Sequence, residues 1–215
     1  EGGATLLETI RTSKLKTIDI GKPLPLQEPY ESDTLDLSNT QMDPGHVLLL
    51  SWWLGTEFSA ALNSVTVDST GNMRSQQTYT LTAGEEKVDL SQKNLGSADV
   101  ALVAVWLQRP EVSAAIASLD CSKNDAITGK RVNDQRTAYV YGEQLEGWLA
   151  LCSSLSGTSI TSVNFSECGL TPHALTPLAD AIKLMAAVAR LSLRGNMITG
   201  SLRDESTDYQ WEYDK

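Results

Sequence analysis

Short triplets in which two apolar residues flank a polar one recur along the chain. Successive side chains of a β-strand point to opposite faces, so each triplet predicts a strand with two buried residues and an exposed one between them. The triplets are Ile18–Ile20, Leu35–Leu37, Val65–Val67, Val88–Leu90, Leu119–Cys121, Val163–Phe165 and Leu191–Leu193. Several are separated by segments with helical spacing of apolar residues, which predicts an α/β chain of strands and helices.

Two sequence signals predict where helices begin. Asp43-Pro44 and Thr171-Pro172 each combine an N-cap acceptor with the residue best suited to the first turn of a helix. They predict helices at residues 45–54 and from 172 onward. In the second of these, apolar residues recur at Leu175, Leu178, Ile182 and Met185. Residues 143–151 predict a shorter helix, and residues 5–13 predict the last turns of another.

The chain contains an internal repeat. Leu35–Leu54 (LDLSNTQMDPGHVLLLSWWL) aligns without a gap with Val88–Leu107 (VDLSQKNLGSADVALVAVWL), at an offset of 53 residues. The similarity continues, after a one-residue shift, in Glu57–Leu62 and Glu111–Ile116. Repeated units of this kind stack side by side, because neither unit can bury its apolar face alone.

One unit has a recognisable spacing. Val188–Ile198 follows L-x-x-L-x-L-x-x-N-x-L, and three other segments nearly repeat it. In these segments the position of Asn196 is taken by Thr70, Asn124 and Cys168. The spacing resembles the leucine-rich repeat in its long form, with one helix per repeat, which is typified by ribonuclease inhibitor. The resemblance covers roughly residues 6–199.

This resemblance implies a fold and a domain organisation. It implies an α/β leucine-rich-repeat solenoid, with a curved parallel β-sheet on the concave face and with helices and extended spacers on the convex face. We expect one solenoid of about seven strands over residues 1–200, followed by an acidic, aromatic C-terminal tail over residues 201–215. Solenoids of this type mostly bind other proteins.

Polar spacers interrupt the regular units. Residues 68–87 and 122–143 carry Thr and Tyr in the alternating pattern typical of strands, so each predicts a short extended or hairpin excursion. Residues 21–32 contain three prolines. Because proline lacks an N–H and fixes φ, this spacer is expected to cross the outer face in an extended conformation.

Composition narrows the classes of ligand and compartment. Asp and Glu number 27 against 17 Lys and Arg, a net charge of −10, which argues against nucleic acid or an anionic membrane and favours a basic protein surface. No apolar run is long enough for a membrane span. Cys121 and Cys152 fall at apolar positions, and Cys168 falls at the position equivalent to Asn196. This placement indicates core thiols in an intracellular, reducing compartment, with the cytoplasm favoured over an organelle.

The polar residue of each triplet is the main candidate for binding. In chain order these residues are Asp19, Asp36, Thr66, Asp89, Asp120, Asn164 and Ser192. Neighbouring strands lie about 4.8 Å apart, so the carboxylates would form an acidic row on the concave face. The row could be structural, with each Asp bonding a Ser or Thr of a neighbouring strand. It could instead bind a basic partner through Asp19, Asp36, Asp89, Asp120 and Asn164. It could also hold a divalent cation, although the row is too flat to surround one.

Exposed aromatic residues are further candidates. Trp52 and Trp53 are adjacent and therefore about 100° apart on a helix, so both cannot face the same neighbour. One is expected in the core, and the other either under the next helix or facing a partner, the candidate being Trp52. In the tail, Tyr209, Trp211 and Tyr213 either cover the last repeat or bind another protein.

No pattern for catalysis is apparent. Only His46 and His173 could supply an imidazole, and both fall in the first turn of a predicted helix. The sequence has no nucleophile motif, phosphate-binding glycine loop or zinc spacing, so neither an enzyme nor a cofactor is expected. We expect a non-enzymatic interaction module, a scaffold or subunit of a larger assembly. The alternative is a regulator of a basic partner enzyme, because similar repeats occur in inhibitors and in activators of Ran-type GTPases.

Overall fold

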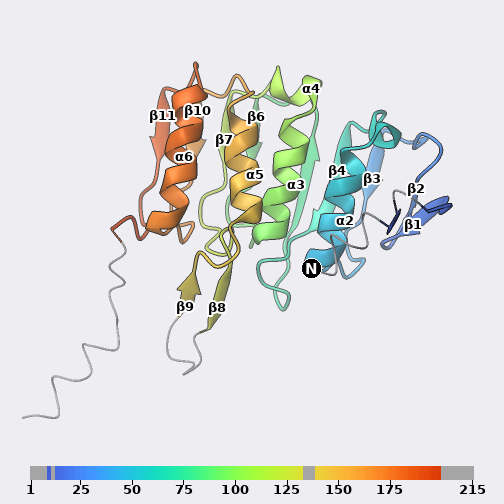
Figure 1. Ribbon diagram of the computed structural model, residues 1–215, viewed down its shortest axis with the longest axis horizontal. Coiled ribbons are helices and arrows are strands. Elements are labelled where there is room, and N and C mark those ends of the chain that lie inside the picture. The colour runs from blue at the N-terminus through green and yellow to red at the C-terminus, as the bar shows by residue number, and fades with distance from the viewer. Residues whose placement is uncertain (1–8, 11–12, 133–138, 200–215) are drawn as a thin grey trace, which may run out of the picture.

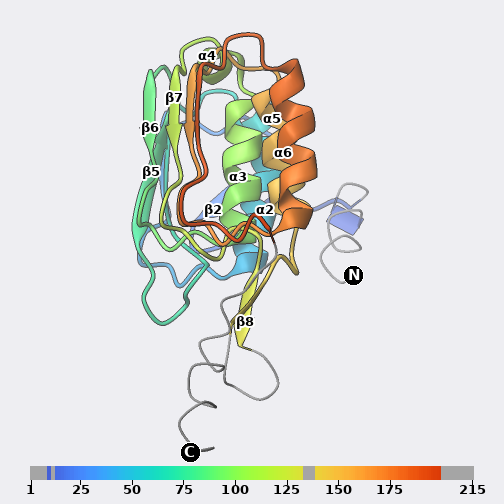
Figure 2. The ribbon, with the colours of Figure 1, turned by 90° about the vertical axis from the view of Figure 1, so that its left-hand side faces the viewer.

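The computed structural model describes residues 9–10, 13–132 and 139–199. These residues form a mixed α/β fold in two layers, with strands on one side and helices on the other (Figure 1, Figure 2). The predicted helix at residues 5–13 lies mostly outside the described residues, and so do the tail and its three aromatic candidates.

A parallel sheet forms one end of the strand layer. Its strands follow the spatial order β11, β10, β7 and β6, which are Arg190–Ser192, Ser162–Asn164, Ser118–Asp120 and Lys87–Asp89. The register places the central apolar residues of the four strands in one row: Leu191, Val163, Leu119 and Val88. The polar residues on either side of each central apolar residue therefore point to the opposite face of the sheet, as the triplet pattern predicts.

The remaining strands do not continue this sheet. β3 (Thr34–Asp36) and β4 (Ser64–Asp68) are parallel, but β5 (Thr78–Thr82) folds back antiparallel onto β4. β1 (Thr17–Asp19) pairs with β2 (Pro23–Pro25) in a separate antiparallel hairpin. The expectation of one parallel sheet joining all seven triplets is therefore wrong for the described residues. The spacers at residues 21–32 and 68–87 cause the difference, because their strands, β2 and β5, pair with the strands that precede them.

The other spacer forms a hairpin as predicted. β8 (Lys130–Val132) and β9 (Tyr139–Tyr141) pair antiparallel and project beyond the two layers (Figure 1). Lys130 lies over the Tyr139 ring, 4.1 Å from its centroid, and also contacts the Asp125 carboxylate.

Five α-helices are described, all on one side of the strands (Figure 2). They are α2 (Pro44–Leu54), α3 (Ser97–Leu107), α4 (Pro110–Ser113), α5 (Glu146–Leu155) and α6 (Pro172–Leu184), with a 3₁₀ turn at Glu57–Ser59. The helix starts at α2 and α6 are confirmed: the Asp43 carboxylate caps α2 by accepting the His46 N–H at 2.9 Å, and Thr171 is the N-cap of α6.

The helix predicted at residues 143–151 begins later than expected. The Gly142 and Gln144 N–H groups donate to the carbonyls of Gly129 and Thr128, which close the base of the β8–β9 hairpin. Residues 143–145 therefore belong to that closure, and α5 starts at Glu146. None of the helices in the described part of the chain is long and apolar enough to cross a membrane.

The core lies between the two layers. Its largest fully buried side chains are those of Trp53, Trp106, Trp148 and Phe165, together with the leucines of the strand triplets. The three cysteines are buried and unbridged. Burial raises the pKa of Cys152 and of Cys168 to about 12, so these thiols stay protonated as ordinary core residues.

Candidate interaction surface

The polar residue of each strand triplet shapes the loop that follows it. The carboxylates of Asp36, Asp89 and Asp120 accept the backbone N–H two residues further on, at 2.9, 2.9 and 2.8 Å. Asn164 and Asp19 make the same bond, at 3.1 and 2.9 Å. Such bonds are Asx turns, which short polar side chains stabilise at the ends of strands. The turns explain why Asp or Asn recurs here: these bonds run from each strand to its own following loop, and not to a Ser or Thr of a neighbouring strand as the structural interpretation predicted.

The asparagine position bridges one repeat to the next. Asn124 Oδ1 accepts the N–H groups of Lys93 and Leu95, both at 3.0 Å, and its Nδ2 donates to the carbonyls of Leu90 and Cys121 at 2.8 Å. Buried backbone groups require such partners, because an unpaired one costs about 1–3 kcal/mol. Asn124 thus satisfies the loops of two neighbouring repeats at once.

The same bridge recurs one repeat further along. Asn196 Oδ1 accepts the N–H groups of Cys168 and Leu170 at 3.0 Å, and its Nδ2 donates to Phe165 O at 2.7 Å. Cys168, in the slot between the two asparagines, directs its Sγ–H to Cys121 O at 3.1 Å. The slot positions identified from the spacing are therefore equivalent in three dimensions.

The first slot residue, Thr70, works with a carboxylate that sequence reasoning missed. Asp99 Oδ2 accepts the Thr70 N–H and hydroxyl at 2.8 and 2.7 Å, and Oδ1 accepts the Tyr79 hydroxyl at 3.0 Å. Burial raises the pKa of Asp99, although all these donors oppose the shift. The internal repeat carried a signal: Asp99 aligns with His46, and in both copies this residue accepts the N–H of the helix N-cap.

Only part of the predicted acidic row comes together. Asp89, Asp120 and Asn164 are aligned across three neighbouring strands, and Asn164 Nδ2 donates to Asp120 Oδ2 at 2.9 Å. Asp36 lies in the second sheet, and Asp19 lies in the separate β1–β2 hairpin. The predicted row of carboxylates, expected to have one gap at Thr66, is therefore divided further, because β5 and β2 interrupt the parallel pairing.

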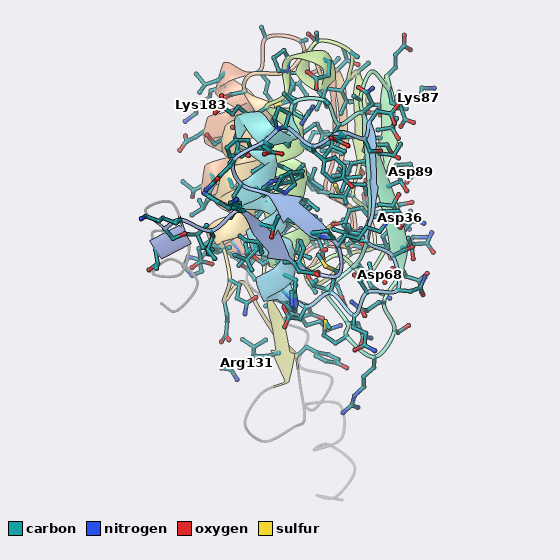
Figure 3. All side chains as sticks on the ribbon, turned by 90° about the vertical axis from the view of Figure 1, so that its right-hand side faces the viewer. Asp36, Asp68, Lys87, Asp89, Arg131 and Lys183 are labelled. Carbon is teal, nitrogen blue, oxygen red and sulfur yellow. The ribbon has the colours of Figure 1, made fainter. Side chains whose placement is uncertain are left out.

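We call the side of the two larger sheets opposite the helices the uncovered face; it carries the polar residues of β3 to β7, β10 and β11. Asp36, Asp89 and Lys87 project from it, away from the helix layer that carries Lys183 (Figure 3). Hydrogen bonds from the Ser38 side chain and N–H lower the pKa of Asp36, and those from Ser91 lower the pKa of Asp89. Both carboxylates therefore stay ionised at neutral pH.

The uncovered face is not acidic throughout. The register places Lys87, Ser118, Ser162 and Arg190 in one row across β6, β7, β10 and β11. Cross-strand hydroxyl contacts add to this character, such as Thr66 with Thr80 at 2.9 Å. The sequence prediction did not consider the residue directly before each triplet and therefore missed the basic ends of this row. In the described residues no group of three or more potential ligands could hold a metal ion, so the cation interpretation gains no support.

The two adjacent tryptophans separate as the helical geometry requires. Trp53 is fully buried, its Nε1–H donates to Pro25 O at 2.7 Å, and the edge of Tyr30 packs against it. Trp52 lies partly exposed on the outer side of α2. Of the two histidines, His46 completes the cap of α2 and His173 lies exposed in the first turn of α6.

Comparison of the sequence with protein-family models and with curated proteins gave no match.

Proposed function

We propose that the chain is a leucine-rich-repeat solenoid that acts as a non-enzymatic scaffold for protein partners. The observation that carries this proposal is the chain of bridges at equivalent positions, Asn124, Cys168 and Asn196, each joining the loop of one repeat to the next. Units joined in this way present their strand-end side chains in register over a broad open surface. An extended surface of this kind suits protein partners better than small substrates, which favour enclosed pockets.

Charge supports a basic protein as the partner of the uncovered face. Asp89 and Asp120 lie directly opposite each other on adjacent strands, an arrangement that destabilises a sheet when both are ionised. A cationic side chain placed between them removes this repulsion. Lys87 and Arg190 at the ends of the neighbouring row would restrict which basic surface fits, because like charges oppose misplaced partners.

The test uses substitutions that keep the loop bonds. In the double variant Asp89→Asn/Asp120→Asn, the amide oxygens still accept the Ser91 and Ser122 N–H groups while both charges are removed. The tagged chain is isolated from its source cells at low salt, and the bound proteins are identified and quantified. We expect the double variant to retain at most about a tenth of the basic partner held by the wild type.

A matched control changes the same number of charges on the helix layer. Glu146→Gln/Asp180→Asn should retain the partner, since both residues lie on helices. Equal loss in both double variants would show that net charge alone matters and would contradict a specific uncovered face. The alternative function is regulation of a basic enzyme. It gains support only if the catalytic rate of the partner enzyme changes in proportion to the amount of this chain bound to it.

A further inference from the structure

The outer sides of α2 and α3 are unusual because they carry no ionised side chain. α2 contains no Asp, Glu, Lys or Arg, and the single Asp of α3, Asp99, is buried. A helix in a single layer over a sheet normally has a polar outer side. α6, in contrast, exposes Asp180 and Lys183.

Apolar side chains occupy these outer sides instead. On α2, Leu48 is 46% exposed, and Trp52 lies one turn further on and is partly exposed. On α3, Ala101 and Val105 are related in the same way and are also partly exposed. α2 and α3 pack side by side (Figure 1), so the two stripes form one continuous apolar surface.

A groove continues this surface at the C-terminal end of α2. It has a volume of about 700 Å³, and its apolar walls are formed by Leu15, Leu26, Trp52, Phe58 and Val105. A second hollow of about 340 Å³ adjoins it, sharing Gly55, Thr56 and Val105. We call the outer stripes and the groove together the helix-side groove.

The charged groups lining the groove favour one sign of ligand. Arg109 is fully engaged, by Glu111 at 2.7 Å and by the carbonyls of Ser59, Ala60 and Leu62. Glu57 lines the groove, is exposed, and has no ion-pair partner among the described residues. Among the described residues that line the groove, the charge left for a ligand is therefore a single carboxylate at the rim of an apolar surface.

From these observations we propose that the helix-side groove binds an amphipathic helix of a partner protein, with its apolar side on Leu48, Trp52 and Val105 and a basic residue facing Glu57. This inference rests on the proposed scaffold function and adds a second docking surface to it. A helix fits better than an extended strand, because the exposed apolar stripes beside the groove lie on two helices packed side by side, a surface of the kind that binds amphipathic helices. Rows of side chains on one helix form ridges that pack into the grooves on the surface of a neighbouring helix.

Two other occupants fit the charges less well. A second copy of this chain would bring together two molecules that each carry a net charge of −10. An anionic membrane surface attracts basic helices, whereas the unengaged charge that lines this groove is acidic. The favoured occupant therefore carries basic residues beside its apolar stripe.

The experiment measures binding of two designed 18-residue helical peptides to the full chain, by anisotropy of a fluorescent label. Both peptides carry leucines at positions i, i+3, i+4 and i+7; one has lysines beside this stripe and the other has glutamates. We expect the lysine peptide to bind at least about tenfold more tightly. Glu57→Lys should reverse this preference.

Matched variants locate the bound peptide. Leu48→Gln and Trp52→Gln should each weaken binding of the lysine peptide about tenfold. Leu149→Gln should change it less than about twofold, because Leu149 is equally exposed, at 47%, but lies on α5 away from the groove. These side chains are at least partly exposed, so circular dichroism should show that every variant folds.

Several results would overturn the proposal. They are no binding of either peptide, equal effects of Leu48→Gln and Leu149→Gln, and a concentration-dependent dimer that Leu48→Gln abolishes. Stronger binding to phosphatidylserine vesicles than to the lysine peptide would also overturn it. The variant Asp89→Asn/Asp120→Asn should bind the lysine peptide normally, so failure of the uncovered face and failure of the helix-side groove are distinguishable.

Discussion

At the scale of single residues, buried polar side chains join neighbouring repeats. Asn124 supplies an acceptor to two N–H groups and donates to two carbonyls, so one side chain satisfies backbone groups from two loops. Asp99 does similar work for Thr70, but as a carboxylate it retains a titratable charge. Spacing alone identified the asparagine slots. It did not identify Asp99, whose partners Thr70 and Tyr79 become neighbours only after β5 folds back.

The raised pKa of Asp99 gives a prediction for stability against pH. Where the folded pKa exceeds the unfolded one, the folded state binds more protons, so the free energy of unfolding falls as pH rises from the unfolded pKa through the folded pKa. Asp99→Asn removes this component. The unfolding free energy of Asp99→Asn relative to wild type should therefore increase as pH rises above about 4.

Urea unfolding between pH 4 and 8 measures this difference. Asp36→Asn is the matched control with the opposite sign, since the pKa of Asp36 is lowered and its stabilising contribution is lost as pH falls. Relative to wild type, that variant should become less stable as pH rises from about 2.5 to about 4, measured by extending the series to lower pH, and the difference should stay flat from about pH 5 to 8. A flat or falling difference for Asp99→Asn would contradict the assigned environment of Asp99.

At the scale of elements, the sequence predicted what local chemistry determines. The helix starts after Asp43 and Thr171 depend on a proline in the first turn, and at Asp43 also on a capping carboxylate, so they could be found without tertiary information. The start of α5 could not, because the carbonyls of Thr128 and Gly129 hold residues 142–144 in a hairpin closure. Strand pairing was also beyond the sequence, since the triplets specify which side chains are buried but not which edge each strand joins.

Packing of α5 against α3 depends on a glycine. A Cβ at Gly147 would lie 2.0 Å from the Ser97 carbonyl oxygen, so the helices cannot keep their separation if a methyl group is added. Gly147→Ala should lower the free energy of unfolding by about 1–3 kcal/mol, even though alanine favours helix formation by about 1 kcal/mol. Chemical denaturation measures the loss.

Gly157→Ala, two residues beyond the C-terminal end of α5, provides the control. Its Cβ would meet only the Ser154 carbonyl oxygen, at 3.8 Å, so stability should change by less than about 0.5 kcal/mol. A tolerated Gly147→Ala, or equal losses in both variants, would contradict close packing of α5 on Ser97.

At the scale of the whole molecule, the two layers offer two different surfaces. The uncovered face is polar and presents Asp89 and Asp120 beside a row that ends in Lys87 and Arg190, whereas the helix-side groove is apolar with one acidic group at its rim. The sequence predicted the first surface from the strand triplets and predicted Trp52 as a partner-facing residue. It could not predict the groove, because Leu15, Leu26 and Phe58 come from segments that only the tertiary fold brings beside Trp52.

The most direct test of the scaffold proposal is to isolate the wild-type chain natively and follow its bound proteins as salt rises to about 0.5 M, which screens exposed charge pairs. We predict bound protein at low salt, with a basic partner released as salt rises and an apolar one retained. Release would follow from pairing with exposed carboxylates, and retention would follow from burial in the groove. A chain that runs as a free monomer at every salt concentration would contradict the account.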